Sequence, residues 1–320
     1  MGWHVTEIAI NYAPRRRIFV FAKIWWTAVR PFSFPVSIVP AAMGVALAWT
    51  QGYAIDAGLA VLTFLGAVAA HAGANLLQDY FDYTGGIDKP GTQGGSGILV
   101  SGLLNPRAVF MGAIVAFATA ALIAVPLLLH AGATLVWIVV AGFVLGAGYA
   151  VPRIGFKYRM LGDVAVFLAF GVGITLGSFV IQTGTLAVAP LACAIPFGFL
   201  VVAILHANNM RDAKDDLEAG VCTLAAALGA RASRGLYAVV VLAAFAVPVA
   251  YVQMKFLNAG ALFIVATVPS ACKLILDVWC SAYDDRAVLT RAVEGTAKLS
   301  LIYGISMIMG MVIWTVVLGR

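Results

Sequence analysis

Long apolar segments fill most of this chain of 320 residues and limit its possible folds more than any other feature. A helix needs about 20 mainly apolar residues to cross the hydrocarbon core of a bilayer. Segments of this kind lie at 33–52, 57–81, 107–129, 132–151, 161–182, 187–210, 234–253, 257–280 and 297–318. Only 11% of the residues are charged, whereas a soluble domain has about 25%. The sequence therefore predicts an all-α, polytopic membrane protein with about nine transmembrane helices in a bundle around a central cavity.

Basic residues are distributed unevenly between the two ends of these predicted helices. Of the 20 Lys and Arg residues, 17 lie in the N-terminal segment or in the connections after the second, fourth, sixth and eighth apolar segments. Cytoplasmic loops of membrane proteins carry such an excess. We therefore expect a multi-pass protein of a prokaryotic cytoplasmic membrane, with a cytoplasmic N-terminus that is not a cleaved signal peptide. Its positive charge would face anionic lipid rather than nucleic acid.

The chain is expected to form one domain over residues 1–320, with a weak internal repeat relating roughly 30–151 to 160–281. The Gly-rich segment Thr84–Gly102 is predicted to be a cytoplasmic loop, either a plain connector or a lid. We infer no obligatory protein partner. The four cysteines form no CxxC pair and are expected to be buried, small apolar residues; they are Cys193, Cys222, Cys272 and Cys280.

Acidic residues gather in two short windows at the cytoplasmic ends of the second and sixth apolar segments. The first window reads Asn75-Leu-Leu-Gln-Asp79-Tyr-Phe-Asp82, followed by Asp88. The second reads Asn208-Asn209-Met-Arg211-Asp212-Ala-Lys-Asp215-Asp216. Residues three and four apart share one face of a helix. The spacing therefore predicts two polar stripes, one with Asn75, Asp79 and Asp82, the other with Asn208, Asp212 and either Asp215 or Asp216.

Like charges on one helix face repel, and the helix dipole disfavours anions at a C-terminus. These stripes therefore require a compensating cation, unless they are plain solvated helix ends. Mg²⁺ typically takes one or two carboxylates plus phosphate oxygens of a substrate, so the stripes predict a site for Mg²⁺ and a diphosphate. Lys157, Arg159 and Arg211 lie on the same side and would neutralise a diphosphate, although topology alone could explain Lys157 and Arg159. His71 and His206 are expected to have structural, hydrogen-bonded roles.

At these residues the sequence resembles the UbiA superfamily of intramembrane prenyltransferases. Arg30-Pro31 resembles the opening segment of the family, and the two windows resemble its two Asp-rich motifs. Lys157-Tyr158-Arg159, with Gly162-Asp163, is similar to the segment before its fifth helix. The Asn-Asn-x-Arg-Asp form of the second window is typical of the 1,4-dihydroxy-2-naphthoate polyprenyltransferase (MenA type) branch, although Gln78 stands where that branch usually has Asn.

The resemblance implies an enzyme that transfers a polyprenyl group from a polyprenyl diphosphate to an aromatic acceptor, with Mg²⁺ as cofactor. The residues that it implies fall into three groups. Metal ligands would be Asp79, Asp82, Asp212 and Asp216, with Asn75 and Asn208. Diphosphate ligands would be Arg30, Asn75, Lys157, Arg159, Asn208 and Arg211, of which Lys157 and Arg211 would join the four Asp residues in catalysis. Groups facing the allylic cation or the acceptor would be Tyr149, Tyr158 and Asn209.

Two other functions are compatible with these features. A prenyltransferase of the same fold could use another acceptor, such as 4-hydroxybenzoate, homogentisate, haem, chlorophyllide or a phospho-sugar. A cation-coupled secondary transporter could use intramembrane carboxylates and repeated halves, but its site would lie near the bilayer midplane. A soluble prenyl synthase is excluded by the apolar composition.

Overall fold

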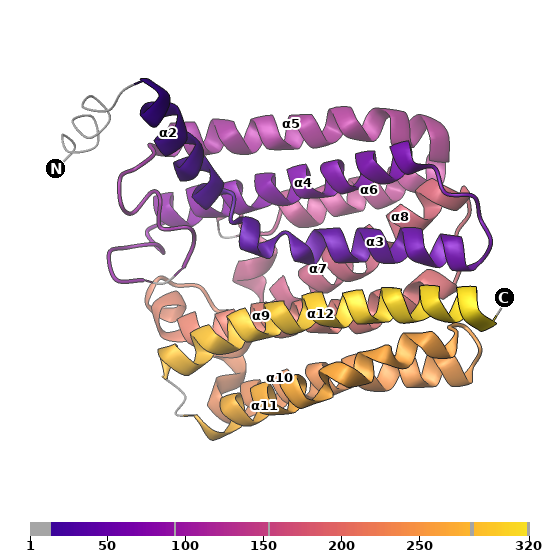
Figure 1. Cartoon of the computed structure of the whole chain (residues 1–320). Coiled ribbons are helices and arrows are strands. Elements are labelled where there is room, and N and C mark those ends of the chain that lie inside the picture. Colours follow the sequence, from indigo (N-terminus) through magenta and orange to yellow (C-terminus); the bar gives the residue numbers. More distant parts are fainter. Residues whose placement is uncertain (1–13, 93, 153, 282–284, 319–320) are drawn as a thin grey trace.

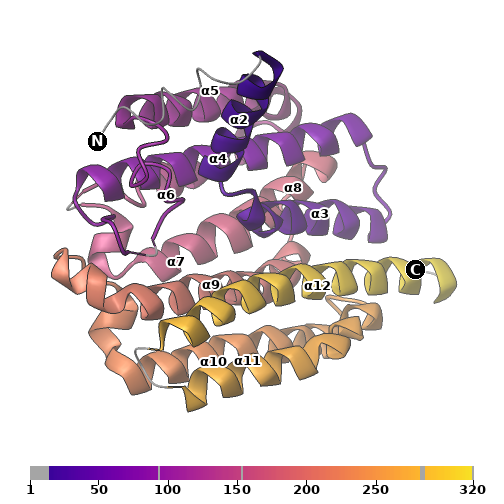
Figure 2. The same cartoon turned by 60° about the vertical axis from the view of Figure 1, so that its left-hand side comes forward.

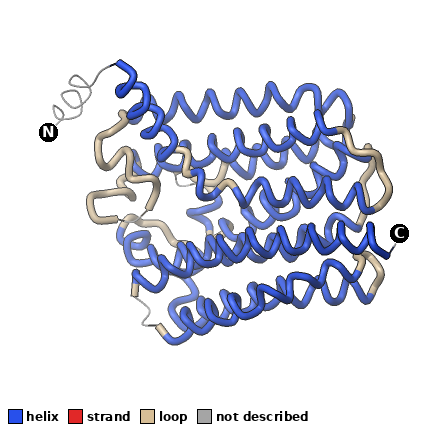
Figure 3. Tube along the Cα trace, viewed as in Figure 1, coloured by secondary structure: helices blue, strands red, loops and turns tan. Residues whose placement is uncertain are grey.

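The computed structural model of the protein describes residues 14–92, 94–152, 154–281 and 285–318, with side chains from residue 19 onward. Its helices run side by side in a bundle, and the described residues contain no strand (Figures 1 and 3). The prediction of an all-α, polytopic architecture is confirmed. The side chains of Arg15, Arg16, Arg17 and Arg153, which contribute to the predicted topology, lie outside the described residues.

Eight helical segments among the described residues are long and apolar enough to cross a membrane. They are η1 and α3 (Pro31–Ser33 and Pro35–Thr50), α4 (Ala57–Thr84), α5 (Pro106–Ala131), α7, η3 and α8 (Gly162–Val166, Phe167–Gly173 and Ile174–Thr183), α9 (Ala189–Glu218), α10 (Leu224–Gln253), η4 and α11 (Ala259–Thr267 and Val268–Cys280) and α12 (Arg286–Leu318).

The predicted fourth span, 132–151, corresponds to a shorter apolar helix, α6 (Ala133–Ala147), of 15 residues. The count of nine spans and the cytoplasmic N-terminus therefore remain predictions. Two further elements, α2 (Pro14–Ala28) and η2 (Phe156–Arg159), lie outside the predicted spans. The second acidic window continues α9 to Glu218, and α10 begins ten residues before its predicted span, with a break at Gly229, where φ is 71°.

Polar side chains define where several helices begin. The side-chain oxygens of Asp56 and Asn105 accept hydrogen bonds from the backbone N–H of Leu59 and Ala108, at 3.0 and 2.7 Å. Such caps satisfy backbone donors that have no partner within the helix. They fix the start of α4 and α5 at the residues that follow, as the apolar patterns predicted to within one residue.

Small residues allow the helices of this bundle to approach closely. A Cβ atom added to Gly44 on α3 would lie 2.5 Å from the backbone oxygen of Thr175 on α8. One added to Gly171, within the π-helical segment η3, would lie 2.5 Å from the Cα atom of Gly198 on α9. Interfaces of small residues are typical of membrane helices, where van der Waals packing replaces the hydrophobic effect. The second contact involves α9, the most buried of the eight segments: 67% of its apolar window is buried, against 11% for α5.

The cysteine prediction is correct for Cys193, which is buried, and wrong for the other three, which are exposed. The physical reason is clearest on α11. Ala271 and Val278, seven residues apart, face the interior of the bundle, so Cys272 and Cys280 fall on the outer face. Apolar character could not distinguish these faces, because in a bilayer both are apolar.

The two acidic windows lie at the same end of the bundle. The long loop between α4 and α5 and the C-terminal end of α9 are on the left in Figure 1, opposite the C-terminal end of α12, and Figure 2 shows the same arrangement from a second direction. The charge pattern predicted that both windows lie at the same end of the bundle, and a cavity lies between them there.

Candidate active site

A cavity of about 180 Å³ lies between the ends of α4, α9 and α12, beneath the loop that joins α4 to α5. Its lining is dominated by charged and amide side chains from six separate parts of the chain. They include Arg30, Gln78, Asp82, Asp88, Tyr149, Lys157, Asn208, Asn209, Arg211, Asp212, Asp215, Asp216, Thr290 and Glu294.

The first acidic window forms the predicted stripe on α4. Asn75, Asp79 and Asp82 are 8%, 3% and 2% exposed, so all three are buried although they lie near the end of the helix. The amide of Gln78 donates a hydrogen bond to Oδ2 of Asp82 at 3.3 Å. The stripe therefore faces protein on the side of the cavity and not solvent, which argues against a plain solvated helix end.

The second window forms the corresponding stripe on α9. Asp212 and Asp216 are buried, and Asp212 accepts hydrogen bonds from Asn208, at 3.2 Å, and from Arg211, at 2.7 Å. Asp215 has a different orientation and pairs with Arg286 of α12 at 2.6 Å. Of the two alternatives left open by helical spacing, Asp216 is the one that approaches the first window.

Each buried carboxylate of the two windows lies next to a cation. Arg30 pairs with Asp79, and Arg211 pairs with Asp212. The amine of Lys157 lies 3.2 Å from Asp82 and 3.8 Å from Asp216, so it joins the two windows. Burial disfavours the charge of Lys157, but the two carboxylates outweigh burial and raise its pKa.

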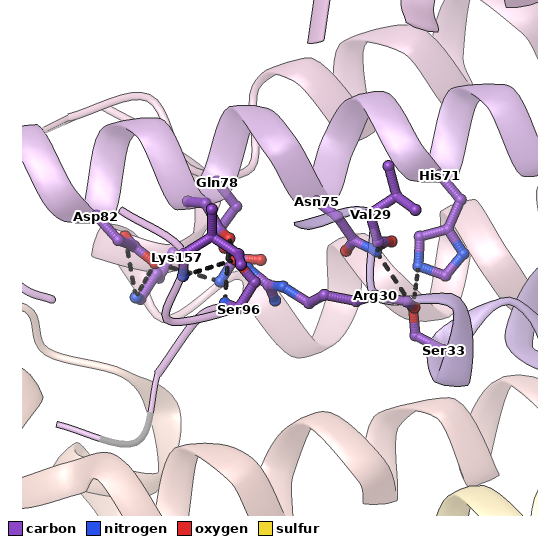
Figure 4. Close-up of polar contacts among 11 residues, drawn as sticks. Val29, Arg30, Ser33, His71, Asn75, Gln78, Asp82, Ser96 and Lys157 are labelled. Atoms are coloured by element: carbon purple, nitrogen blue, oxygen red, sulfur yellow. Dashed lines mark hydrogen bonds and ion pairs between the residues drawn. The ribbon is translucent and has the colours of Figure 1, made fainter. Parts of the chain in front are cut away.

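The loop between α4 and α5 folds onto these carboxylates (Figure 4). Ser96 donates from both its backbone N–H and its hydroxyl group to Oδ2 of Asp79. A Cβ atom added to Gly95, where φ is 63°, would lie 2.5 Å from Oδ2 of Asp88, so a residue with a side chain would be strained there. Burial, followed by the charge of Asp82, raises the pKa of Asp88 to about 6. The loop contacts the site directly, as a lid would.

The donors around the cavity fit a hard divalent cation. Carboxylate and amide oxygens are the ligands that Mg²⁺ prefers, and both windows supply them, since Asp82, Asn208, Asp212 and Asp216 line the cavity. Within the described ranges, no three His, Cys, Asp or Glu side chains converge on one metal position, since the carboxylates lean toward Arg30, Lys157 and Arg211. The residues are therefore suitable for Mg²⁺ shared with a substrate rather than for a closed, all-protein metal site.

The predicted site residues fall into two groups. The cavity is lined by nine of them: Arg30, Asp82, Tyr149, Lys157, Asn208, Asn209, Arg211, Asp212 and Asp216. Asn75, Asp79, Tyr158 and Arg159 are not among the lining residues. The side-chain nitrogen of Asn75 donates to the backbone oxygen of Val29 and to Ser33, and Arg159 is exposed. The roles predicted for the residues of both groups remain predictions.

Helix α12 supplies lining residues that sequence reasoning missed, Thr290 and Glu294. Both precede the apolar segment 297–318, in a stretch that the apolar pattern predicts to be a connection. Helical continuation of α12 back to Arg286 brings them to the cavity. A signal was available: Glu294 and Thr290 are four residues apart and would share a face if the helix began earlier.

His206 has the structural role expected for it. Its ring is fully buried, and its two nitrogens lie 3.1 Å from Oδ2 of Asp163 on α7 and 3.2 Å from the backbone oxygen of Ser233 on α10. The ring thus connects α9 to α7 and α10 just before the second window. This contact fixes the helical phase of Asn209, Asp212 and Asp216.

Comparison with known proteins gives relatives over almost the whole chain. The model of the UbiA prenyltransferase family matches residues 37–315. UbiA prenyltransferase domain-containing protein 1 of Homo sapiens is 31% identical over 296 residues, which cover 89% of this chain and 82% of the human protein. The protein of the same name from Xenopus tropicalis is 30% identical over 288 residues, covering 89% of this chain and 81% of that protein.

Solved structures share the fold. An apo UbiA homolog from Aeropyrum pernix K1 superposes with a TM-score of 0.66 at 15% identity, covering 87% of this chain and 97% of that one. A UbiA homolog from Archaeoglobus fulgidus bound to GPP and Mg²⁺ gives a TM-score of 0.61 at 16% identity, covering 89% and 99%. At these identities the likeness concerns the fold alone. Together with the family match over residues 37–315, these observations show that the chain belongs to the UbiA prenyltransferase family.

Proposed function

We propose that this protein transfers a polyprenyl group from a polyprenyl diphosphate to an aromatic acceptor, and that the acceptor is 1,4-dihydroxy-2-naphthoate, as in menaquinone biosynthesis. One observation carries the proposal: Arg30, Lys157 and Arg211 meet two stripes of buried carboxylates around one cavity at the end of an apolar bundle. A polyanion that arrives with a divalent cation would balance both sets of charges.

The cations would bind the diphosphate and support its departure. As the bond between the first prenyl carbon and the diphosphate oxygen breaks, negative charge grows on the leaving pyrophosphate. Arg30, Lys157 and Arg211 would stabilise that charge through preorganised, charge-assisted hydrogen bonds. Asp79, Asp82, Asp212 and Asp216 would hold Mg²⁺, which supplies further neutralisation of the diphosphate.

The acceptor would attack the allylic cation that remains. A carbon–carbon bond forms to the aromatic ring, and the ring regains aromaticity by losing a proton, or CO₂ and a proton for a ring that carries a carboxyl group. Tyr149 lines the cavity and could stabilise the cation through its ring face. Exclusion of water by the apolar bundle would protect the cation from hydrolysis.

The choice of acceptor rests on the Asn208-Asn209-x-Arg211-Asp212 pattern. Asn208 and Asn209 both line the cavity, so both could contact an acceptor there. The names of the animal relatives specify no acceptor. The animal relatives do not support the prokaryotic cytoplasmic membrane expected from the sequence. We infer a multi-pass membrane protein whose cavity lies on the cytoplasmic face of its membrane.

A secondary transporter is disfavoured by the position of the cavity. Its lining residues lie toward the C-terminal ends of α4 and α9, near the N-terminal end of α12, and on connections at the same end of the bundle, whereas transporter sites lie near the bilayer midplane.

The test is a product assay in detergent with one polyprenyl diphosphate and a panel of acceptors: 1,4-dihydroxy-2-naphthoate, 4-hydroxybenzoate and homogentisate. We expect release of pyrophosphate and a prenylated naphthoate product by mass spectrometry, with both lost in EDTA and restored by Mg²⁺. Asp79→Ala and Asp212→Ala should abolish turnover without loss of folded protein. Product from another acceptor only would reject the naphthoate assignment, and folded protein that forms no product with any of the three would reject the proposed reaction for this panel.

A further inference from the structure

Arg30, whose side chain reaches the cavity, occupies an unusual backbone conformation. It lies between α2 and η1 with φ 54° and ψ 61°, in the left-handed region that residues other than glycine seldom adopt. Its carbonyl oxygen accepts two hydrogen bonds from Ser33, one from the backbone N–H at 3.0 Å and one from the hydroxyl at 2.8 Å. The turn at Arg30 is therefore closed by the side chain of Ser33 as well as by the backbone.

The hydrogen-bond capacity of Ser33 is fully used. A hydroxyl group has one donor and two acceptor positions. The proton of Ser33 goes to Arg30, so its oxygen accepts from the two other groups within reach, Nε2 of His71 at 3.2 Å and the amide nitrogen of Asn75 at 3.2 Å. This arrangement places a proton on Nε2 of His71.

The other ring nitrogen of His71 completes the chain. Nδ1 lies 2.7 Å from the hydroxyl of Ser37 and accepts its proton, so the ring is the neutral tautomer with hydrogen on Nε2. The ring is 7% exposed and packs edge-on against Phe34 and Phe170, with centroids 5.6 and 4.8 Å away. These contacts and the two hydrogen bonds hold the imidazole ring in place.

Residues on one stripe of α4 therefore act on both the backbone and the guanidinium group of Arg30. His71 and Asn75 act through Ser33 on its backbone turn, and Asp79, on the next turn of the helix, pairs with its guanidinium group (Figure 4). We propose that Ser33 and His71 are positioning residues, which hold the left-handed turn of Arg30 and thereby direct its guanidinium group into the cavity, where it binds diphosphate. The binding of diphosphate by Arg30 rests on the proposed function, whereas the role of Ser33 and His71 in holding the turn does not.

The turn is tested by stability, without any ligand. Glycine adopts a positive φ without strain, so Arg30→Gly should reduce the need for the Ser33 hydroxyl. We expect Ser33→Ala to lower the melting temperature in detergent, and to lower it much less when Arg30→Gly is present. Equal effects in the two backgrounds would overturn the role of Ser33 in holding the turn.

The effect on the cavity is tested by calorimetric binding of inorganic pyrophosphate in the presence of Mg²⁺. Ser33→Ala and His71→Phe, which keeps the aromatic contacts, should each weaken binding about tenfold. Neither should weaken it further in an Arg30→Ala protein. Ser33→Thr and His71→Gln, which retain a hydroxyl and an amide donor, should restore binding to within about threefold of the wild type.

The outcomes separate the two proposals. The positioning role would be overturned if the loss of pyrophosphate affinity from Ser33→Ala or His71→Phe added to the loss from Arg30→Ala. It would also be overturned if these variants melted at a lower temperature yet bound pyrophosphate normally. The proposed diphosphate site would stand in either case. A wild-type protein that binds no pyrophosphate would reject both the diphosphate site and the direction of Arg30 toward it. In that case the stability experiment would still decide the role of Ser33 in the turn.

Discussion

Nζ of Lys157 lies 3.2 Å from Oδ2 of Asp82, a residue 75 positions earlier in the chain. It also lies 3.8 Å from Asp216, so one buried amine connects the two acidic windows. The pKa of Lys157 is raised, so its amine is charged throughout the neutral range and can pair with both carboxylates.

Replacing Lys157 should therefore remove a preorganised cation. We expect Lys157→Met to lower kcat/KM by about 10²–10³-fold, the loss typical of a group that stabilises a leaving anion. The measurement is steady-state pyrophosphate release with a saturating acceptor. Lys214→Gln is the matched control: Lys214 is an exposed cation on α9 that does not line the cavity, and its loss should change the rate less than about threefold.

The two neighbouring carboxylates Asp215 and Asp216 should respond differently to the same change. Asp216 faces Lys157, whereas Asp215 pairs with Arg286. We expect Asp216→Asn to reduce turnover at least about 100-fold and Asp215→Asn less than about tenfold, because only the first removes a charge from the junction of the two windows. Similar losses from both, measured at equal Mg²⁺, would contradict this assignment.

The pH dependence of stability should report on Asp88. Its pKa is raised from 3.8 to about 6, mainly by burial and then by Asp82, so the folded protein binds a proton that the unfolded chain releases. This residue therefore makes the protein less stable as pH rises from about 4 through about 6.

Asp88→Asn should remove that effect. In EDTA, the variant and the wild type should melt at similar temperatures near pH 4, and the variant should melt higher above about pH 6. A difference in melting temperature that is the same at every pH would indicate that the contacts of residue 88 with Gly94 and Gly95, and not the charge of Asp88, cause the change in stability.

Helix packing should be sensitive to one added methyl group at Gly44. The Cβ atom would meet the backbone of Thr175 at 2.5 Å and of Phe179 at 2.8 Å, and neither backbone atom can move without shifting α8. We expect Gly44→Ala to destabilise the protein by about 1–3 kcal/mol, measured by thermal unfolding in detergent. Gly142→Ala on α6, where nothing lies within 4 Å of the added atom, should be neutral or slightly stabilising.

Within the acidic windows, the sequence predicted which residues share a helix face. The stripes of Asp79 with Asp82 and of Asp212 with Asp216 depend only on helical periodicity, which is a local property of the chain. The choice between Asp215 and Asp216 was beyond reach, because it depends on the position of Arg286, 71 residues from Asp215. The lining residues Thr290 and Glu294 were missed for a related reason: an apolar run marks the membrane core, whereas α12 continues beyond it as a polar helix.

The sequence by itself determined the apolar helices, the end of the bundle that carries the charge, and the residues that share each polar stripe, because the bilayer and the helical repeat act on short stretches of chain. Only the tertiary structure decided which stripes face one another, which cation meets each carboxylate, and which faces of α11 and α12 turn inward. Those relations are set by packing between helices far apart in the sequence. Arg30 illustrates both levels: its place at the start of the first span can be read from the sequence, but its left-handed turn and its contact with Asp79 depend on Ser33, His71 and the packing of α4.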